Sequence, residues 1–153
     1  MRPLYIFDLD GTLALTEHRQ HILGDLRDPN RWKRYFEACV DDRPNQPVID
    51  TMHRLMCFVE MWIWSGRSEE VRPETIRWLT AHTNLTTREA EAILRMRQVG
   101  DFTPDEELKA RWFDDLPPGD RQRLVAVFDD RDKVVDMWRA KGVACFQVAP
   151  GDF

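Results

Sequence analysis

Five short apolar runs alternate with helical segments along this chain, and this alternation is the feature that most restricts its fold. Strands that alternate with helices form a mainly parallel sheet with helices on both faces, so the pattern predicts an α/β fold. Residues that act on a ligand lie at the carboxyl ends of the strands in such sheets. The five predicted strands are Leu4–Phe7, Phe58–Trp64, Ile93–Met96, Leu124–Phe128 and Ala144–Val148. The third of them overlaps a segment, Glu89–Leu94, that could equally form a helix.

The helical segments between these strands carry start signals of two kinds. Pro47 and Pro73 stand in the first turn of two of them, where a missing N–H costs little. Capping residues mark the others, namely Thr86 with Glu89, Thr103 with Glu106, and Asp132 ahead of a helix that stops at Gly142.

The stretch from Leu15 to Pro44 interrupts this regular alternation. It separates the first strand from the next helix by about thirty residues, far more than a typical βα loop. It contains a helix-like piece, Asn30–Val40, with three aromatic residues. We therefore expect a small helical lid, inserted after the first strand and covering the site.

Composition narrows the class of protein and its partners. The 153 residues suit one compact domain over 1–153, and the net charge of −5 argues against an extended nucleic-acid surface. A local cluster of Arg and Lys would still suffice to hold a few phosphates. No apolar run approaches membrane-spanning length, so no membrane partner is expected. The three cysteines form no CxxC pair, which favours a reducing, cytoplasmic setting without disulfides.

The segment from Asp8 to Thr12 is the motif with the most chemical content. Asp8 and Asp10 follow an apolar strand, Gly11 permits the turn that must come there, and Thr12 can begin a helix whose free N–H groups face a phosphate. Two carboxylates this close repel each other and need a cation or a shared proton, and Mg²⁺ prefers such oxygen ligands. The alternative reading is a solvated Asp-Gly turn.

Acidic residues also follow the fourth predicted strand. Asp129 and Asp130 come directly after a buried strand, where carboxylates are costly unless they bind something. A metal ion is the natural partner, and loop solvation is the alternative.

Two further motifs offer groups for a phosphate. Ser65, Gly66 and Arg67 follow the second predicted strand and provide a hydroxyl, a backbone N–H and a guanidinium, although a Ser-Gly turn is common. Lys109 lies one helical turn after Asp105, so that it is either aimed at a phosphate and oriented by Asp105 or part of a surface ion pair.

Together these motifs resemble the haloacid dehalogenase (HAD) superfamily, whose members are mostly phosphatases with a Rossmann-like core. The resemblance rests on Asp8-x-Asp10-Gly-Thr, Ser65, Lys109 and Asp129-Asp130, and it spans nearly the whole chain. It implies a sheet in which the strands lie in the order fifth, fourth, first, second, third.

A narrower resemblance is to the 3′-phosphatase domain of phage-type polynucleotide kinase-phosphatase. That family also uses an Arg shortly after the nucleophile, which is Arg19 here, and an Asp one turn before the Lys, which is Asp105 here. The matching segments are Ile6–Ala14, Ser65–Arg67, Gly100-Asp101, Asp129–Arg131, Val135-x-Met137-Trp138-Arg139 and Gly151-Asp152-Phe153.

The resemblance implies a magnesium-dependent, two-step hydrolysis of a phosphomonoester. Asp8 attacks phosphorus and forms an aspartyl-phosphate. Asp10 protonates the leaving oxygen and then activates the water that cleaves the intermediate. The expected metal ligands are Asp8, Asp10 through its carbonyl, Asp129, and Asp130 as ligand or close neighbour. The expected phosphate and substrate ligands are Thr12, Ser65, Gly66, Arg67 and Lys109, with Asp105 orienting Lys109 and with Arg19, on the lid, holding the rest of the substrate.

The substrate stays open at this point. The chain contains no GxxxxGK[ST] P-loop, which predicts a phosphatase without a kinase domain. A 3′-phosphatase that acts on nucleotides or polynucleotide ends in nucleic-acid repair is expected. The alternatives are a 5′-nucleotidase or other small-molecule HAD phosphatase, and a non-catalytic binding module. The sequence does not give the oligomeric state.

Overall fold

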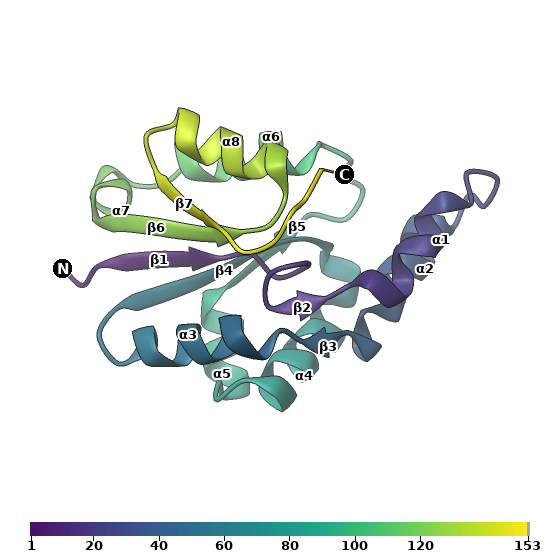
Figure 1. Ribbon diagram of the computed structural model, residues 1–153, viewed down its shortest axis with the longest axis horizontal. Helices are drawn as coiled ribbons and strands as arrows, with labels where there is room; N and C mark the ends of the chain where they lie inside the picture. The colour runs from purple at the N-terminus through teal and green to yellow at the C-terminus, as the bar shows by residue number, and fades with distance from the viewer. Residues whose placement is uncertain (153) are drawn as a thin grey trace.

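The structure is a computed structural model that describes residues 1–152. Its central element is a five-stranded parallel sheet, seen edge-on in Figure 1. The strand order is β7-β6-β1-β4-β5. The second to fifth predicted strands are β4, β5, β6 and β7, so this order is the predicted one, and the predicted fold is confirmed. The strands are β1 (Leu4–Phe7), β4 (Glu60–Ser68), β5 (Leu94–Arg97), β6 (Leu124–Asp129) and β7 (Ala144–Gln147).

Helices cover the two faces of this sheet, and each face has its own apolar core (Figure 1). Neighbouring residues of β1 point to opposite faces, so that Phe7 packs in one core and Ile6 in the other. Helices α6 (Asp105–Asp114) and α8 (Asp132–Ala140) cover the face of Ile6, where Trp64 and Trp138 are also buried. The opposite face is covered by α3 (Gln46–Met56), α4 (Arg72–His82) and α5 (Thr87–Ile93), and α7 (Pro118–Arg123) precedes β6.

The segment after β1 forms the predicted helical insertion, residues 15–44, which projects to one side in Figure 1. Its base is a short antiparallel pair, β2 (Ala14–Leu15) with β3 (Arg43–Pro44). The predicted helix at Thr12 is wrong, because the chain turns at Gly11 and enters β2 directly. Between these strands lie η1 (Glu17–Arg19), α1 (Gln20–Gly24), α2 (Arg31–Glu37) and η2 (Ala38–Asp41).

The second predicted strand is wrong at both ends. Phe58 lies before β4 and is 76% exposed, whereas the strand continues through Ser65, Gly66 and Arg67 to its end. The pairing of β4 with β5 shifts register after Ser65 and resumes at Ser68 opposite Arg97. An irregular ladder can therefore carry the strand through a Ser-Gly pair that reads as a turn.

Two of the predicted caps also differ from the structure. The Thr86–Glu89 capping box is confirmed. The Thr103 hydroxyl instead donates to the Asp101 carboxylate, and Pro104 takes the cap position of α6. Asp132 is the first residue of α8 rather than its cap, and its backbone N–H donates to the carbonyl of Gly151. Phe153, the last residue of the terminal motif, lies outside the described residues. Within residues 1–152, no helix has the length and apolar character needed to cross a membrane.

Candidate active site

Asp8 stands at the end of the central strand and is 6% exposed. Its backbone N–H donates to the carbonyl of Phe128 over 2.9 Å, which fixes the start of the turn against β6. Its Oδ1 accepts a hydrogen bond from Lys109 Nζ at 2.6 Å, and its Oδ2 accepts a longer one from Thr12 Oγ1 at 3.4 Å. The structure thus brings Lys109, which lies about a hundred residues further along the chain, to two predicted site residues of the motif after β1.

Three carboxylates converge at this point. Oxygen atoms of Asp8, Asp129 and Asp130 all lie within 4.8 Å of one another. Lys109 Nζ also donates to Asp129 Oδ2 at 2.7 Å, so its charge bridges two of the three acids. Gly11 is required for this approach because its φ is +84° and a Cβ atom there would lie 2.1 Å from Asp130 Oδ2.

The electrostatics of this cluster favour a bound cation. Burial raises the pKa of Asp8, the charges of Asp129 and Asp130 raise it further, and Lys109 opposes them. Burial and the charge of Asp129 also raise the pKa of Asp130 to about 7. A divalent cation reverses this repulsion, and a donor set made of carboxylate oxygens fits a hard ion such as Mg²⁺.

Asp10 has a different environment, although it belongs to the same motif. Its Oδ1 accepts hydrogen bonds from Arg19 Nη2 at 2.8 Å and from Arg67 Nε and Nη2 at 2.9 and 2.6 Å. Both arginines are fully buried. Burial alone would raise the pKa of Asp10, but the charges of Arg67 and Arg19 lower it below its ordinary value. The Asp10 carboxylate is therefore held in its charged form beside the acidic cluster.

Asp42 completes this second cluster, and sequence reasoning missed it. Its side chain is fully buried and accepts hydrogen bonds from Arg19 Nε at 2.8 Å and from Nη2 atoms of Arg19 and Arg67, each at 2.7 Å. His18 Nε2 lies 2.8 Å from the same carboxylate. Asp42 follows another Asp in a polar stretch, and nothing in that pattern separates a buried acid from a solvated one.

Of the other predicted phosphate ligands, Gly66 lines the cleft at this centre, whereas Thr12, Ser65 and Arg67 are fully buried and do not line it. Ser65 is fully buried, and its Oγ accepts a hydrogen bond from Arg67 N at 3.2 Å. Arg67 directs its guanidinium toward Asp10 and Asp42, so the predicted bidentate grip on a phosphate remains a prediction.

Asp105 acts on Lys109 through charge. Its carboxylate accepts hydrogen bonds from Arg97 and, at 3.2 Å, from Arg131. Burial would lower the pKa of Lys109, but the charges of Asp129, Asp8 and Asp105 raise it. A Cβ atom on Gly66 would lie 2.6 Å from Asp105 Oδ1, so the glycine lets β4 approach the start of α6.

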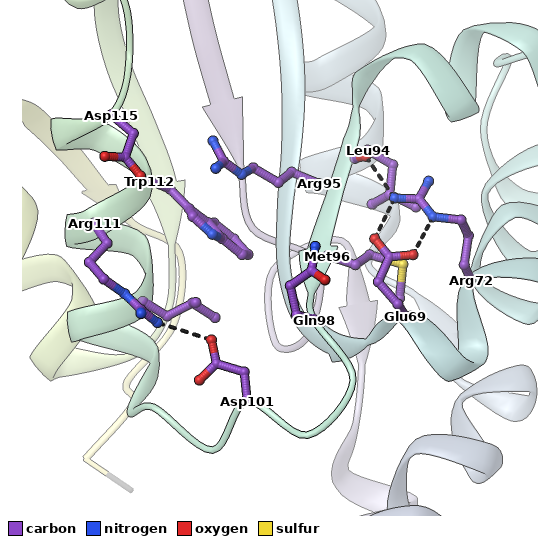
Figure 2. Close-up of a pocket in the computed structure, with 11 residues that line it drawn as sticks. Glu69, Arg72, Leu94, Arg95, Met96, Gln98, Asp101, Arg111, Trp112 and Asp115 are labelled. Atoms are coloured by element: carbon purple, nitrogen blue, oxygen red, sulfur yellow. Dashed lines mark hydrogen bonds and ion pairs between the residues drawn. The ribbon is translucent and has the colours of Figure 1, made fainter.

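A cleft of about 630 Å³ contains this chemistry. Asp8, Asp10, Lys109, Asp129 and Asp130 line it together with residues of the insertion and of the loop between β5 and α6. A smaller hollow of about 320 Å³ lies beside β5 and α6, where Arg95 extends next to Trp112 (Figure 2). The acidic cluster does not line this second hollow. The large cleft is therefore the candidate active site.

Comparisons with known proteins agree with this geometry. Residues 2–153 match the family model described as the polynucleotide kinase PNKP phosphatase domain, of HAD type. A chain in the structure of the Pnkp1/Rnl/Hen1 RNA repair complex is 29% identical, with a TM-score of 0.72 over 99% of this chain and 44% of its own length. A second Pnkp1/Rnl/Hen1 complex gives 30% identity and a TM-score of 0.73 over 99% and 48%.

The chain thus spans less than half the length of these Pnkp1-complex chains. A more distant neighbour is CbbY from Rhodobacter sphaeroides in complex with phosphate, which is 17% identical. Its TM-score of 0.61, over 100% of this chain and 88% of the other, shows a shared fold.

Proposed function

Because the chain belongs to the HAD-type phosphatase domains of polynucleotide kinase, we propose that it is a Mg²⁺-dependent phosphatase of nucleotide or polynucleotide 3′-phosphates that acts through an aspartyl-phosphate. The observation that carries this proposal is the convergence of Asp8, Lys109, Asp129 and Asp130 in one cleft.

Asp8 is the proposed nucleophile. Lys109 holds its Oδ1 at 2.6 Å, whereas its Oδ2 has only the 3.4 Å contact with Thr12. Oδ2 is therefore the freer atom for in-line attack on phosphorus. The new O–P bond forms as the ester P–O bond breaks, and water then attacks phosphorus to release inorganic phosphate and restore Asp8.

Asp10 is the proposed general acid and base. Arg19 and Arg67 fix its Oδ1, so Oδ2 is the atom that delivers a proton to the leaving oxygen and later takes one from water. Its lowered pKa suits the second step, in which it acts as a base. The first step requires that Asp10 takes up a proton as the phosphorylated substrate binds.

Positive charge at the transferring phosphoryl group comes from two sources in this proposal. Lys109 supplies one, because its charged form is stabilised by the surrounding carboxylates. Asp8, Asp129, the Asp10 carbonyl and Asp130 would hold Mg²⁺, which supplies the other. Thr12, Ser65 and Gly66 remain the proposed ligands of the phosphate oxygens.

The 3′-phosphate specificity draws its support from the family and from the neighbours. The two solved relatives named above are chains of Pnkp1/Rnl/Hen1 complexes, one of them called an RNA repair complex. By analogy with these relatives, we propose that this chain acts on a polynucleotide end and has repair proteins as partners. A reducing, cytoplasmic setting belongs to the same proposal, and Cys39, Cys57 and Cys145 are free thiols.

A comparison of phosphate release from matched substrates tests the proposal. Nucleotides and oligonucleotides with a 3′-phosphate are compared with the same molecules carrying a 5′-phosphate, with Mg²⁺ present. We expect faster release from 3′-phosphates. A preference for 5′-nucleotides would identify a 5′-nucleotidase, and no release from any substrate would indicate a binding module.

A further inference from the structure

The loop between β5 and α6, residues 98–104, displays apolar side chains at the mouth of the cleft. Val99 is 61% exposed and Phe102 is 86% exposed, and both line the cleft. Large exposed apolar side chains that gather at a cleft are typical of ligand sites, whereas scattered ones need no explanation.

The backbone of this loop is held firmly. Arg97 Nη1 donates to the carbonyls of Asp101 at 3.0 Å and Thr103 at 2.5 Å. The Asp101 carboxylate accepts from the Thr103 amide at 2.9 Å and, on its other oxygen, from Arg111 at 3.0 Å, a contact visible in Figure 2. Phe102 lies between these anchored residues, so binding a ligand would order its side chain but would not have to order the loop backbone as well.

A second aromatic side chain lines the same cleft from the insertion. Trp32, on α2, is 46% exposed. Its ring packs against Tyr35 at a centroid distance of 6.1 Å and against Phe36 at 6.0 Å. Trp32 is therefore supported by its neighbours, while nearly half of its surface remains open.

We propose that Phe102 and Trp32 bind the nucleobase of the nucleotide whose phosphate reaches Asp8, an inference that rests on the proposed function. The cleft of about 630 Å³ is much larger than a phosphate group requires. The charged residues of the cleft can bind the phosphate, and its aromatic residues can bind the rest of the substrate. Every base has a π-face that can stack on such rings, so the site accepts different bases. Gln20, Asn30 and Lys33 also line the cleft and offer hydrogen-bonding groups to base edges.

The test compares two oligonucleotides with a 3′-phosphate, one with an ordinary terminal nucleotide and one whose terminal nucleotide lacks its base. Phe102→Ala and Trp32→Ala should each reduce kcat/KM on the ordinary substrate roughly tenfold, mainly by raising KM, since stacking stabilises ground and transition states alike. Both variants should act on the abasic substrate at close to the wild-type rate. Phe102→Tyr, which keeps the ring, should restore activity on the ordinary substrate.

Phe58→Ala is the matched control because Phe58 is 76% exposed and lies outside the cleft. It should change neither rate. Melting temperatures show whether Trp32→Ala disturbs the insertion, and Phe102→Ala carries the decisive result because its side chain is almost entirely exposed.

Several outcomes would overturn the inference. Equal losses on both oligonucleotides would assign the rings to shaping the phosphate site, and no loss on either would assign them to another partner, such as a protein. Failure of the proposed function gives a separate signal, because wild-type protein would then release no phosphate from either 3′-phosphorylated oligonucleotide. If 5′-nucleotides are the substrates instead, a nucleoside 5′-phosphate compared with ribose 5-phosphate tests the same stacking.

Discussion

Two charged clusters stand next to each other in the cleft, and they are built from different parts of the chain. The first joins Asp8, Asp129, Asp130 and Lys109, which come from strand ends and from α6. The second joins Asp10 to Arg19 and Asp42, which the insertion supplies, and to Arg67 of β4. The first cluster has an excess of carboxylates and suits a cation, whereas guanidinium groups balance the carboxylates of the second. In the proposed mechanism, the sheet therefore supplies the phosphoryl chemistry and the insertion sets the protonation state of Asp10, the proposed acid–base residue.

The largest effect should come from Asp8→Asn, which removes the proposed nucleophile of the first cluster. An amide does not form the aspartyl-phosphate, and losing a nucleophile costs several orders of magnitude, so activity should fall below about 1% of wild type. Phosphate release measures this, and circular dichroism checks that the fold is intact. Substantial turnover by Asp8→Asn would show that another residue attacks phosphorus.

Removal of Mg²⁺ should have a nearly equal effect and act on the same cluster. The carboxylates of Asp8, Asp129 and Asp130 repel one another without a cation. Excess EDTA should abolish phosphate release, and added Mg²⁺ should restore it. Zn²⁺ should substitute poorly because the cluster offers neither His nor Cys ligands. Full activity in EDTA would contradict the proposed metal site.

Lys109→Ala should reduce kcat by roughly 100- to 1,000-fold, because it removes a buried positive charge from the developing oxyanions. Asp105→Ala should cost clearly less, since Asp105 influences Lys109 only through charge and is held by Arg97 and Arg131. Steady-state kinetics on one 3′-phosphorylated oligonucleotide compare the two variants. Equal and small losses would mean that neither residue takes part in the chemistry.

The first cluster could largely be predicted from the sequence, and the second could not. Asp8 and Asp129 follow apolar runs, and parallel strands bring their carboxyl ends to one edge, so local patterns suffice to place them together. The pairing of Arg19 with Asp42 depends on how the insertion folds back on itself, which no local pattern encodes. Arg19 was predicted as a substrate ligand on a lid, and the structure places it fully buried behind Asp10.

The exposed ring of Phe102 was also beyond sequence reasoning. An apolar residue in a short loop is as consistent with burial as with display at a cleft. Its surroundings become clear only when Arg97 and Asp101 are seen to hold the loop backbone.

Arg19→Ala should have the smallest effect of these changes, and it separates the two clusters most directly. Arg19 is fully buried, and its guanidinium is already bonded to Asp10 at 2.8 Å and to Asp42 at 2.7 Å, so it should act through Asp10 rather than on the nucleotide. We expect a loss of roughly tenfold in kcat/KM, about 1.4 kcal/mol of transition-state stabilisation, carried by kcat. The loss should be similar on p-nitrophenyl phosphate and on a 3′-nucleotide. Asp42→Asn should show the same pattern because it loosens Arg19 and Arg67 together.

Arg34→Ala is the matched control for this prediction, since Arg34 lies on α2 of the same insertion and pairs at the surface with Asp28. It should leave both rates unchanged. Arg19→Ala and Asp42→Asn should also lower the melting temperature, because each removes one hydrogen-bonded partner from the other buried charges of the second cluster and leaves these charges unbalanced. A loss confined to the nucleotide would instead place Arg19 in contact with the substrate, as the family resemblance implies. The insertion would then bind the substrate directly, which would contradict the inference that it acts only by setting the protonation state of Asp10.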